Sequence, residues 1–389
     1  MRPDNQEHST NPLRRFANYL AILAPRREKP LRTQASGHPH RRLWYAAAVG
    51  VVAVAAAGCA PGSSGNGSSG GSSGSGSSAK TTSITIALPV AEPVQAPVYL
   101  AAQLGYFSKE GINAHIIVLA SDTAADAALV AGSVQYTSVN AVALITAAEK
   151  GVPMQDVCTE YNGPSWALAV SSSVLSSTHV TASMSLKQLL TALHGTKVAI
   201  VGTAVSAPGL IFTGLLKQEG LPANWVSLVG VSASSDLTSA YSHGEVGAVF
   251  DTQPTPDQEV QTSGGKVVFN TTQLTALDQI PWEGLVGTKS YISGNAKVDK
   301  AVCAAIGEAD DYLLKNPSAA ASDLASTFPS LSATLLKDSL VAYKWAPDAG
   351  MTAAQWTTSA SLLKQYGLIS SVSSSTLSGA YTIKYLPAG

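Results

Sequence analysis

Residues 97–112 have the sequence PVYLAAQLGYFSKEGI, and this stretch decides the fold class. Pro97 suits the first turn of a helix, because its missing N–H and fixed φ angle cost nothing there. Gly105 ends the helix and Gly111 turns the chain into a strand, with a Tyr-Phe pair between them as an apolar plug. The stretch therefore predicts a short helix that is packed by aromatic rings and leads directly into a strand.

The rest of the chain repeats this strand–helix rhythm in two runs. We expect strands near residues 84–88, 114–119, 134–137, 152–161 and 167–170, and then near 197–201, 226–229, 246–250 and 266–269. Short helices that end in Gly separate them, and residues 298–364 read as mainly helical. This alternation predicts an α/β fold of mostly parallel sheets flanked by helices, and the two runs predict two lobes with a C-terminal helical wrap.

Residues 41–58 have the features of an export signal. An Arg pair precedes an apolar run that is rich in Ala and Gly and too short for a convincing membrane span. The run ends in small residues directly before Cys59, a pattern that resembles the bacterial lipobox, in which this Cys carries a lipid. An ordinary signal peptide or a single membrane anchor is the alternative. The Gly/Ser-rich residues 60–80 then read as a flexible tether between the lipid and a folded body.

Charge is divided unevenly along the chain. Residues 1–58 hold nine Lys or Arg and three acidic residues, whereas the 331 residues that follow hold fifteen basic residues, all Lys, and twenty-two acidic ones. An acidic body without a Lys/Arg stripe cannot neutralise phosphates, so nucleic acid is excluded as a partner.

The residues of the body show no catalytic or metal-binding motif. The four histidines there lack metal-ligand spacing, and no Gly-x-Ser-x-Gly, P-loop or Gly-x-Gly-x-x-Gly motif occurs, so we predict neither a metal nor a cofactor. The state of Cys158 and Cys303 has two interpretations. In an exported protein they can form a disulfide, and otherwise they are buried thiols.

Residues 97–112 resemble the opening helix of the solute-binding proteins of ABC importers, in the nitrate/sulfonate/taurine and thiamine-pyrimidine-precursor group. In that family a Pro-led helix runs into Gly-Tyr-Phe and then Glu-Gly-Leu or Glu-Gly-Ile. Residues 195–203 look like the family's entry strand of the second lobe. Residues 240–251 look like its helix–Gly–strand segment that delivers a pocket residue. The resemblance spans about residues 83–370.

The resemblance implies a periplasmic-binding-protein-like fold and a function without catalysis. It implies a monomeric lipoprotein on the extracytoplasmic face of the cell membrane that captures a small organic ligand between hinged lobes and delivers it to an ABC permease with its ATPase. Because planar anions are captured chiefly by Arg, which the body lacks, a neutral or cationic aromatic ligand such as a pyrimidine is favoured over an anion. Two alternatives remain: an enzyme of the pyrimidine-precursor-synthase type on the same fold, and a sensor lipoprotein without transport.

The predicted domain boundaries follow from these segments. Residues 1–58 form the N-terminal extension and signal peptide, 59–80 the lipidated Cys and tether, 81–172 the first part of lobe 1, 173–283 lobe 2, and 284–389 the return to lobe 1 with the C-terminal helices.

Candidate site residues follow from the rule that ligands of α/β sheets bind beyond the carboxyl ends of the strands, near helix N-termini. This rule selects Glu92, Gln95, Ser121, Asp122, Ser138, Asn140, Tyr161, Trp166, Thr203, Ser206, Asp251 and Trp282. Structural roles also stay open: helix capping for Ser138, Asn140, Thr203 and Ser206, a turn for Tyr161, packing for Trp166 and Trp282, and a hinge hydrogen bond for Asp251.

Overall fold

The computed structural model describes residues 81–119 and 121–387, which all belong to one unit of the chain. The predicted export signal, Cys59 and the tether lie outside the described residues. No helix within the described ranges is both long and apolar enough to span a membrane.

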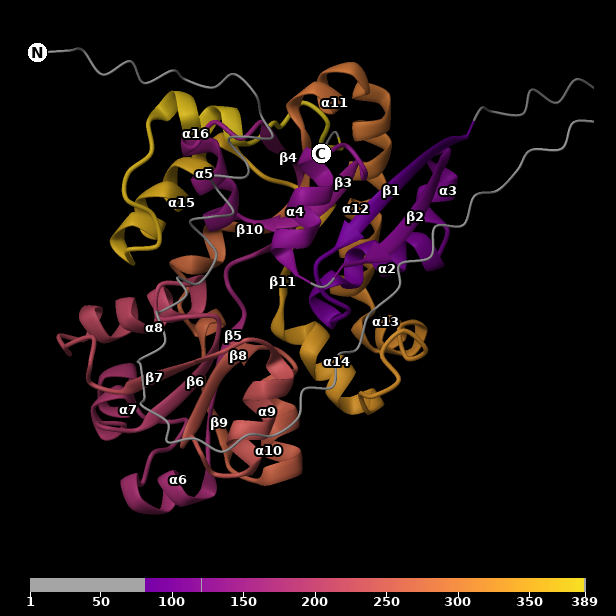
Figure 1. Ribbon diagram of the computed structural model, residues 1–389. Helices are drawn as coiled ribbons and strands as arrows, with labels where there is room; N and C mark the ends of the chain where they lie inside the picture. Colours follow the sequence, from indigo (N-terminus) through magenta and orange to yellow (C-terminus); the bar gives the residue numbers. More distant parts are fainter. Residues whose placement is uncertain (1–80, 120, 388–389) are drawn as a thin grey trace, which may run out of the picture. The chain divides into compact units, whose positions relative to one another are not determined.

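The strands of the described chain form two sheets (Figure 1). The six-stranded sheet has the order β11-β4-β10-β3-β1-β2, and the five-stranded sheet has the order β7-β6-β8-β5-β9. Their bounds are β1 Thr82–Leu88, β2 Ile112–Val118, β3 Tyr136–Asn140, β4 Met154–Asn162, β5 Trp166–Val170, β6 Lys197–Val201, β7 Ser227–Val231, β8 Ala248–Thr252, β9 Lys266–Asn270, β10 Pro281–Thr288 and β11 Lys344–Trp345.

Helices follow most of these strands. The α-helices are α2 Ala96–Gln103, α3 Tyr106–Lys109, α4 Asp122–Val130, α5 Ala141–Glu149, α6 Ser172–Thr178, α7 Leu186–Ala192, α8 Ala207–Gln218, α9 Ser234–Ser242, α10 Thr255–Ser263, α11 Lys289–Gly294, α12 Ala296–Lys315, α13 Pro317–Asp323, α14 Ala333–Ala342, α15 Ala353–Gln365 and α16 Ser374–Ala380. Short 3-10 turns are η1 Pro93–Gln95, η2 Thr271–Gln273, η3 Leu277–Gln279 and η4 Pro347–Ala349.

The stretch at 97–112 folds as its sequence predicts. Helix α2 ends at a left-handed residue, Gly105 with φ +78°, which glycine adopts without the strain that a Cβ would cause. The chain then forms the single turn α3, whose Phe107 is buried, and enters β2 at Ile112. Both α2 and α3 pack against α12, so the C-terminal part of the chain covers this opening segment.

Each sheet is mixed, but most strands of each sheet run in one direction, as predicted: β1, β2, β3 and β4 in the first sheet and β6, β7, β8 and β9 in the second. β1 pairs in parallel with β2 and β3, but β10 runs antiparallel to both β3 and β4. In the second sheet β6 is parallel to β7 and β8, whereas β5 is antiparallel to β8 and β9. The reversed strands β5 and β10 are those at which the chain enters a sheet from the other one, after a connection that carries no α-helix.

The expected lobe boundaries, at residues 172/173 and 283/284, lie a few residues beyond the points where the chain passes from one sheet to the other. The second sheet already begins with β5 at Trp166, and the first sheet already resumes with β10 at Pro281. The Ser/Thr-rich residues 171–185 contain helix α6, whose N-cap Ser171 accepts a hydrogen bond from the Val174 amide.

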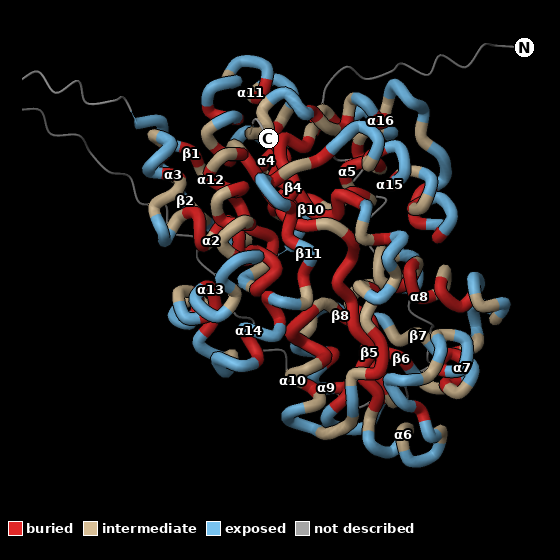
Figure 2. The backbone as a smooth tube through the Cα atoms, turned by 180° about the vertical axis from the view of Figure 1, so that it is seen from behind, coloured by how far each residue is buried: buried red, intermediate tan, exposed pale blue. Residues whose placement is uncertain are grey.

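Strand β10 lies in the centre of the first sheet, although its sequence PWEGLVGT did not predict a strand. Pro and Gly are typical of turns, so the pattern was hidden. A Cβ on Gly284 would lie 2.5 Å from the Asp156 carboxylate, so glycine makes room for an acidic side chain on β4. The central strands β3, β5, β8 and β10 are almost entirely buried, whereas the edge strands β2 and β7 are partly exposed (Figure 2).

Candidate ligand-binding site

A cavity of about 190 Å³ lies where the two sheets face each other. Its walls come from the ends of β1, β3 and β4, from the starts of the reversed strands β5 and β10, and from the ends of β6 and β8. Because a reversed strand begins at the edge where its neighbours end, all these points meet at one place. The lining residues are Pro89, Val90, Glu92, Val94, Gln95, Asp122, Asn140, Tyr161, Trp166, Val201, Ser234, Asp251, Thr252, Trp282 and Glu283.

The structure brings eight of the twelve predicted site residues to this cavity. They are Glu92, Gln95, Asp122, Asn140, Tyr161, Trp166, Asp251 and Trp282. Asn140 combines two roles: its Oδ1 accepts a hydrogen bond from the Ala143 amide and caps α5, while its side-chain NH₂ donates to no residue in the described ranges. The capping interpretation and the lining position are therefore compatible for this residue.

Four predicted residues do not line the cavity, and their side chains bond to their own loops or to a neighbour. Ser121 is exposed and accepts a hydrogen bond from the Ala124 amide as the cap of α4. The Ser138 hydroxyl is buried and donates to Gln95 Oε1 at 2.8 Å, one layer behind the wall. Thr203 is exposed, and the Ser206 hydroxyl donates to the Thr203 carbonyl at 2.7 Å, so the loop before α8 is bonded to itself.

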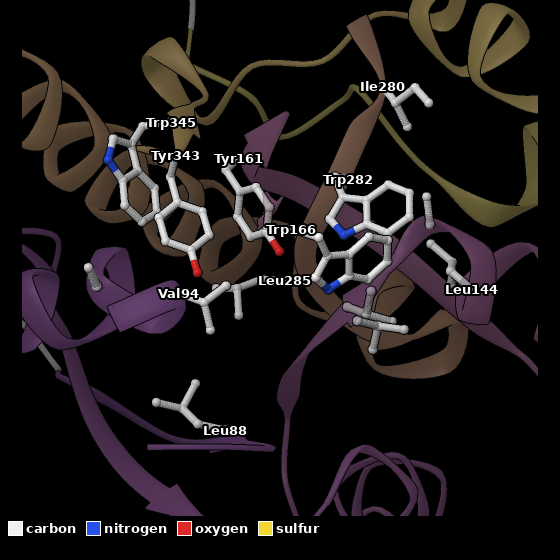
Figure 3. Packing of buried hydrophobic residues seen from close by; sticks show 14 of the residues in the cluster. Leu88, Val94, Leu144, Tyr161, Trp166, Ile280, Trp282, Leu285, Tyr343 and Trp345 are labelled. Carbon is white, nitrogen blue, oxygen red and sulfur yellow. The ribbon is translucent and has the colours of Figure 1, made fainter. Parts of the chain in front are cut away.

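Aromatic rings form one wall. Trp166 and Trp282 meet edge to face, with ring centroids 5.4 Å apart and an interplanar angle of 83°. Tyr161 packs in the same manner against Tyr343, at 5.1 Å, and Tyr343 in turn lies 5.0 Å from Trp345. Figure 3 shows both groups of rings near Val94 and Leu285. Such a wall offers flat apolar surface and π faces to a ligand.

Four carboxyl groups line the cavity with the aromatic wall: Glu92, Asp122, Asp251 and Glu283. Burial, together with the nearby carboxylates of Asp251 and Asp122, raises the pKa of Glu92 to about 7. Burial also raises the pKa of Asp251 to about 6, against the hydrogen bonds that it accepts. No Lys, Arg or His belongs to the described lining, so nothing there neutralises these groups.

Asp251 and Ser234 form a polar pair on the second sheet's side. The Ser234 hydroxyl, at the start of α9, donates to Asp251 Oδ2 at 3.1 Å. Asp251 is only 5 % exposed and stands at the end of β8. A second cavity, of about 230 Å³, adjoins the first one through the shared residues Glu92 and Ser234.

Glu283 and Ser234 are the main polar residues that the sequence analysis missed. Glu283 follows Trp282 in β10, the strand hidden by its Pro and Gly residues, and a prediction of that strand would have placed both residues at its start. Its Oε2 accepts a hydrogen bond from the Tyr161 hydroxyl at 3.4 Å. Thr252, Val201 and the apolar residues after β1 were also missed, because strand-end rules select polar groups and say little about apolar walls.

A second set of buried acids lies behind the cavity wall. Both carboxyl oxygens of Glu160 on β4 and of Asp310 on α12 are buried without a hydrogen-bond partner among the described residues. Burial raises the pKa of Glu160 to about 8, and the pKa of Asp310 is raised well above its usual range by burial and by the charge of Glu160. Protonated, neutral carboxyl groups satisfy such an environment better than ionised ones.

Cys158 and Cys303 are free thiols, so the structure contradicts the disulfide interpretation. Both are fully buried, and the Cys303 thiol donates a hydrogen bond to the Val157 carbonyl at 3.2 Å. Burial raises the pKa of each thiol, which keeps both protonated and unreactive. In the part of the chain that the structure describes, no group of three or more His, Cys, Asp or Glu residues is arranged to hold a metal ion.

Comparison with known proteins identifies the architecture. The ligand-binding component of an ABC-type import system from Staphylococcus aureus, with zinc bound, is 13% identical with a TM-score of 0.63, over 78% of this chain and 98% of that chain. The alkanesulfonate-binding protein SsuA from Xanthomonas axonopodis pv. citri, bound to MOPS, is 15% identical with a TM-score of 0.59, over 79% and 100%. The nitrate-binding protein NrtA from Synechocystis PCC 6803 is 15% identical with a TM-score of 0.57, over 78% and 86%. No match was found among curated proteins.

These structures share one class of fold with this protein, the two-lobed fold of periplasmic binding proteins. The family described as NMT1/THI5 like matches residues 92–320, which is more than half of the chain. The chain therefore belongs to the NMT1/THI5-like family. The family resemblance found at residues 97–112 is confirmed.

Proposed function

We propose that this protein is the extracytoplasmic solute-binding component of an ABC importer, which captures a small organic ligand and delivers it to a permease with its ATPase. One observation carries the proposal: strand ends of both sheets line a single cavity that combines aromatic, amide and carboxyl groups. Its volume of about 190 Å³ is below the roughly 300–1,000 Å³ of common ligand pockets, which favours a ligand with few heavy atoms.

Binding by this fold requires relative motion of the lobes. Two connections join the sheets next to the cavity, residues 163–165 between β4 and β5 and residues 271–280 between β9 and β10. A pair of short connections allows rigid lobes to rotate about them, and ligand between the lobes favours the closed arrangement. The permease then recognises the closed form.

The lipid anchor is the second part of the proposal. A lipid on Cys59, followed by the Gly/Ser tether, would hold a monomeric body at the outer face of the cell membrane. Substitution Cys59→Ser should release the protein from the membrane fraction and abolish incorporation of radiolabelled palmitate. Retention of both label and membrane association in this variant would contradict the anchor.

An enzyme on the same fold is the alternative, and the lining argues against it. Synthesis of a pyrimidine precursor would need a reactive His or Lys or a cofactor site at the cavity. The described lining residues include neither His nor Lys nor Cys, and their polar groups are carboxyls, amides and hydroxyls. These groups bind and orient a ligand, which supports capture rather than chemistry.

Two measurements on the purified full chain test the proposal. Mass spectrometry after denaturation should detect a released small molecule in about equimolar amount, and X-ray scattering should show a smaller radius of gyration when this molecule is added back. A chain that releases no ligand, binds none from a cell extract and keeps one radius of gyration is not a solute-binding protein.

A further inference from the structure

The charge of the cavity points to the chemical class of its ligand. Four carboxyl groups line it, while no cationic side chain does so within the described chain. An acidic lining of this kind repels anions and is stabilised by a positive charge placed among the carboxylates. Nitrate or a sulfonate would find neither an Arg fork nor a Lys at these walls.

Two of these carboxyl groups have at most one hydrogen-bond partner among the described residues. Glu283 is only 9 % exposed, and Tyr161 alone among the described residues donates a hydrogen bond to it, at 3.4 Å. Glu92 is half-buried, and its carboxylate accepts no hydrogen bond from any residue in the described ranges. Carboxylates held in a cavity with so few donors cost free energy, which a ligand that carries N–H donors and positive charge would recover.

A bare metal ion does not fit this arrangement. Metal binding needs several ligand atoms that converge on one point, and no such group of three or more occurs in the described part of the chain. The carboxyl groups are instead spread around a cavity that also has the indole rings of Trp166 and Trp282 in its wall. Spread charge beside aromatic faces suits an organic cation, which can contact both.

Glu92 and Asp251 stand on opposite lobes. Glu92 follows β1 of the first sheet, Asp251 is the last but one residue of β8 in the second, and both line the same cavity. Two carboxylates that face each other across a cleft oppose its closure as long as nothing lies between them.

Given the proposed function, we propose that the ligand is a small organic cation, with an ammonium or amidinium group and a flat apolar body, that bridges Glu92 and Asp251. The positive charge offsets the repulsion between the two lobes, and the tryptophan wall receives the apolar body. Ligand charge thereby controls lobe closure.

Three probes of nearly the same shape test the ligand class. Benzamidinium carries one positive charge, benzamide is neutral, and benzoate carries one negative charge. Calorimetry on the full chain should show benzamidinium binding at least about tenfold more tightly than benzamide, with benzoate the weakest. Glu92→Gln and Asp251→Asn should each reduce this preference for the cation. The matched control Glu149→Gln changes an exposed acid outside the cavity and should leave it unchanged.

The outcomes separate this inference from the proposed function. Equal affinity for benzamidinium and benzamide, preference for benzoate, or no binding of benzamidinium at millimolar concentration would overturn the cationic ligand. A released natural ligand that proves to be an anion would also overturn it, while the solute-binding function would stand. Asp251 accepts a hydrogen bond from Ser234, so Asp251→Asn also changes a structural contact. Its melting temperature is therefore compared with that of Glu92→Gln, whose carboxylate has no such partner, to separate an effect on binding from an effect on stability.

Discussion

The indole ring of Trp166 meets the indole ring of Trp282 edge to face, with centroids 5.4 Å apart, although the two residues lie near the starts of strands in different sheets. Trp166 starts β5 and Trp282 lies second in β10, so each stands where the chain has just crossed between the lobes. Both are nearly buried and both line the cavity. The pair therefore joins the hinge region to the ligand site.

Replacement of Trp282 by Leu should weaken binding of an aromatic cation. Loss of a ring face costs about 0.5–2 kcal/mol of cation–π attraction, which corresponds to a 2- to 30-fold rise in the dissociation constant of benzamidinium. Trp282→Phe should keep most of the affinity, because it keeps a ring. Trp225→Leu is the control, since Trp225 is absent from the cavity lining, and calorimetry on all three variants decides. Equal affinities for the Leu and Phe variants would exclude a role for the ring.

Tyr343 provides a test of the contact between the lobes. Its hydroxyl donates a buried hydrogen bond to the Gln253 carbonyl at 2.8 Å, between the segment before β11 and the segment after β8. Tyr343→Phe leaves this carbonyl without a donor and should lower the free energy of unfolding by about 1–3 kcal/mol in urea titrations. In the control Tyr312→Phe, the lost partner Asp323 is partly exposed to water, so the decrease should be smaller. Similar losses in both variants would contradict this reasoning.

Affinity for a cationic ligand should rise with pH. The pKa of Asp251 is about 6 and that of Glu92 about 7, and a cation binds the ionised forms, so protons compete with it at lower pH. The carboxyl groups of Asp122 and Glu259 face these two and raise their pKa further. Calorimetry should therefore show benzamidinium binding more tightly as the pH rises through 6 and 7, with proton release on binding. Neutral benzamide should give a much flatter profile, and an equally flat profile for benzamidinium would contradict the assignment.

Glu160 should make stability depend on pH without touching the ligand. Its pKa is raised from 4.5 to about 8 in the fold, so its contribution to stability is fully present below pH 4.5 and is lost as the pH rises through about 8. The Glu160→Gln variant has no titrating group at this position. Its free energy of unfolding, relative to that of the wild type, should therefore rise by at most about 1.4 kcal/mol per pH unit between pH 4.5 and about 8. Urea unfolding at several pH values measures the difference, with Glu149→Gln as the exposed control. Parallel curves for the wild type and Glu160→Gln would show that Glu160 is ionised in the folded protein.

Much of the site could be inferred from strand ends alone. Asp251 and Asn140 lie at the ends of their strands, and parallel neighbours end at a common edge, so the position of each residue at the binding edge of its own sheet followed from topology. Ser206 and Thr203 satisfied the same rule, but the Ser206 hydroxyl donates a hydrogen bond to the Thr203 carbonyl within their own loop. No pattern of residue types reveals this bond. The sequence analysis missed Glu283 because the Pro and Gly residues of β10 are typical of turns and hid the strand. Gly284 is needed there because a Cβ would collide with the Asp156 carboxylate.

The sequence by itself determined the features that depend on a few neighbouring residues or on composition. These are helix starts at Pro, left-handed turns at Gly, alternating apolar strands, and an acidic body without Arg. Contacts between residues distant in the chain were decided only by the tertiary structure: the reversed direction of β5 and β10, the two unpaired thiols, and the four carboxyl groups gathered in one cavity. The reason is physical. Backbone preference depends on neighbours in sequence, whereas strand direction and charge clustering depend on which buried surfaces pack together after the chain has crossed twice between its sheets.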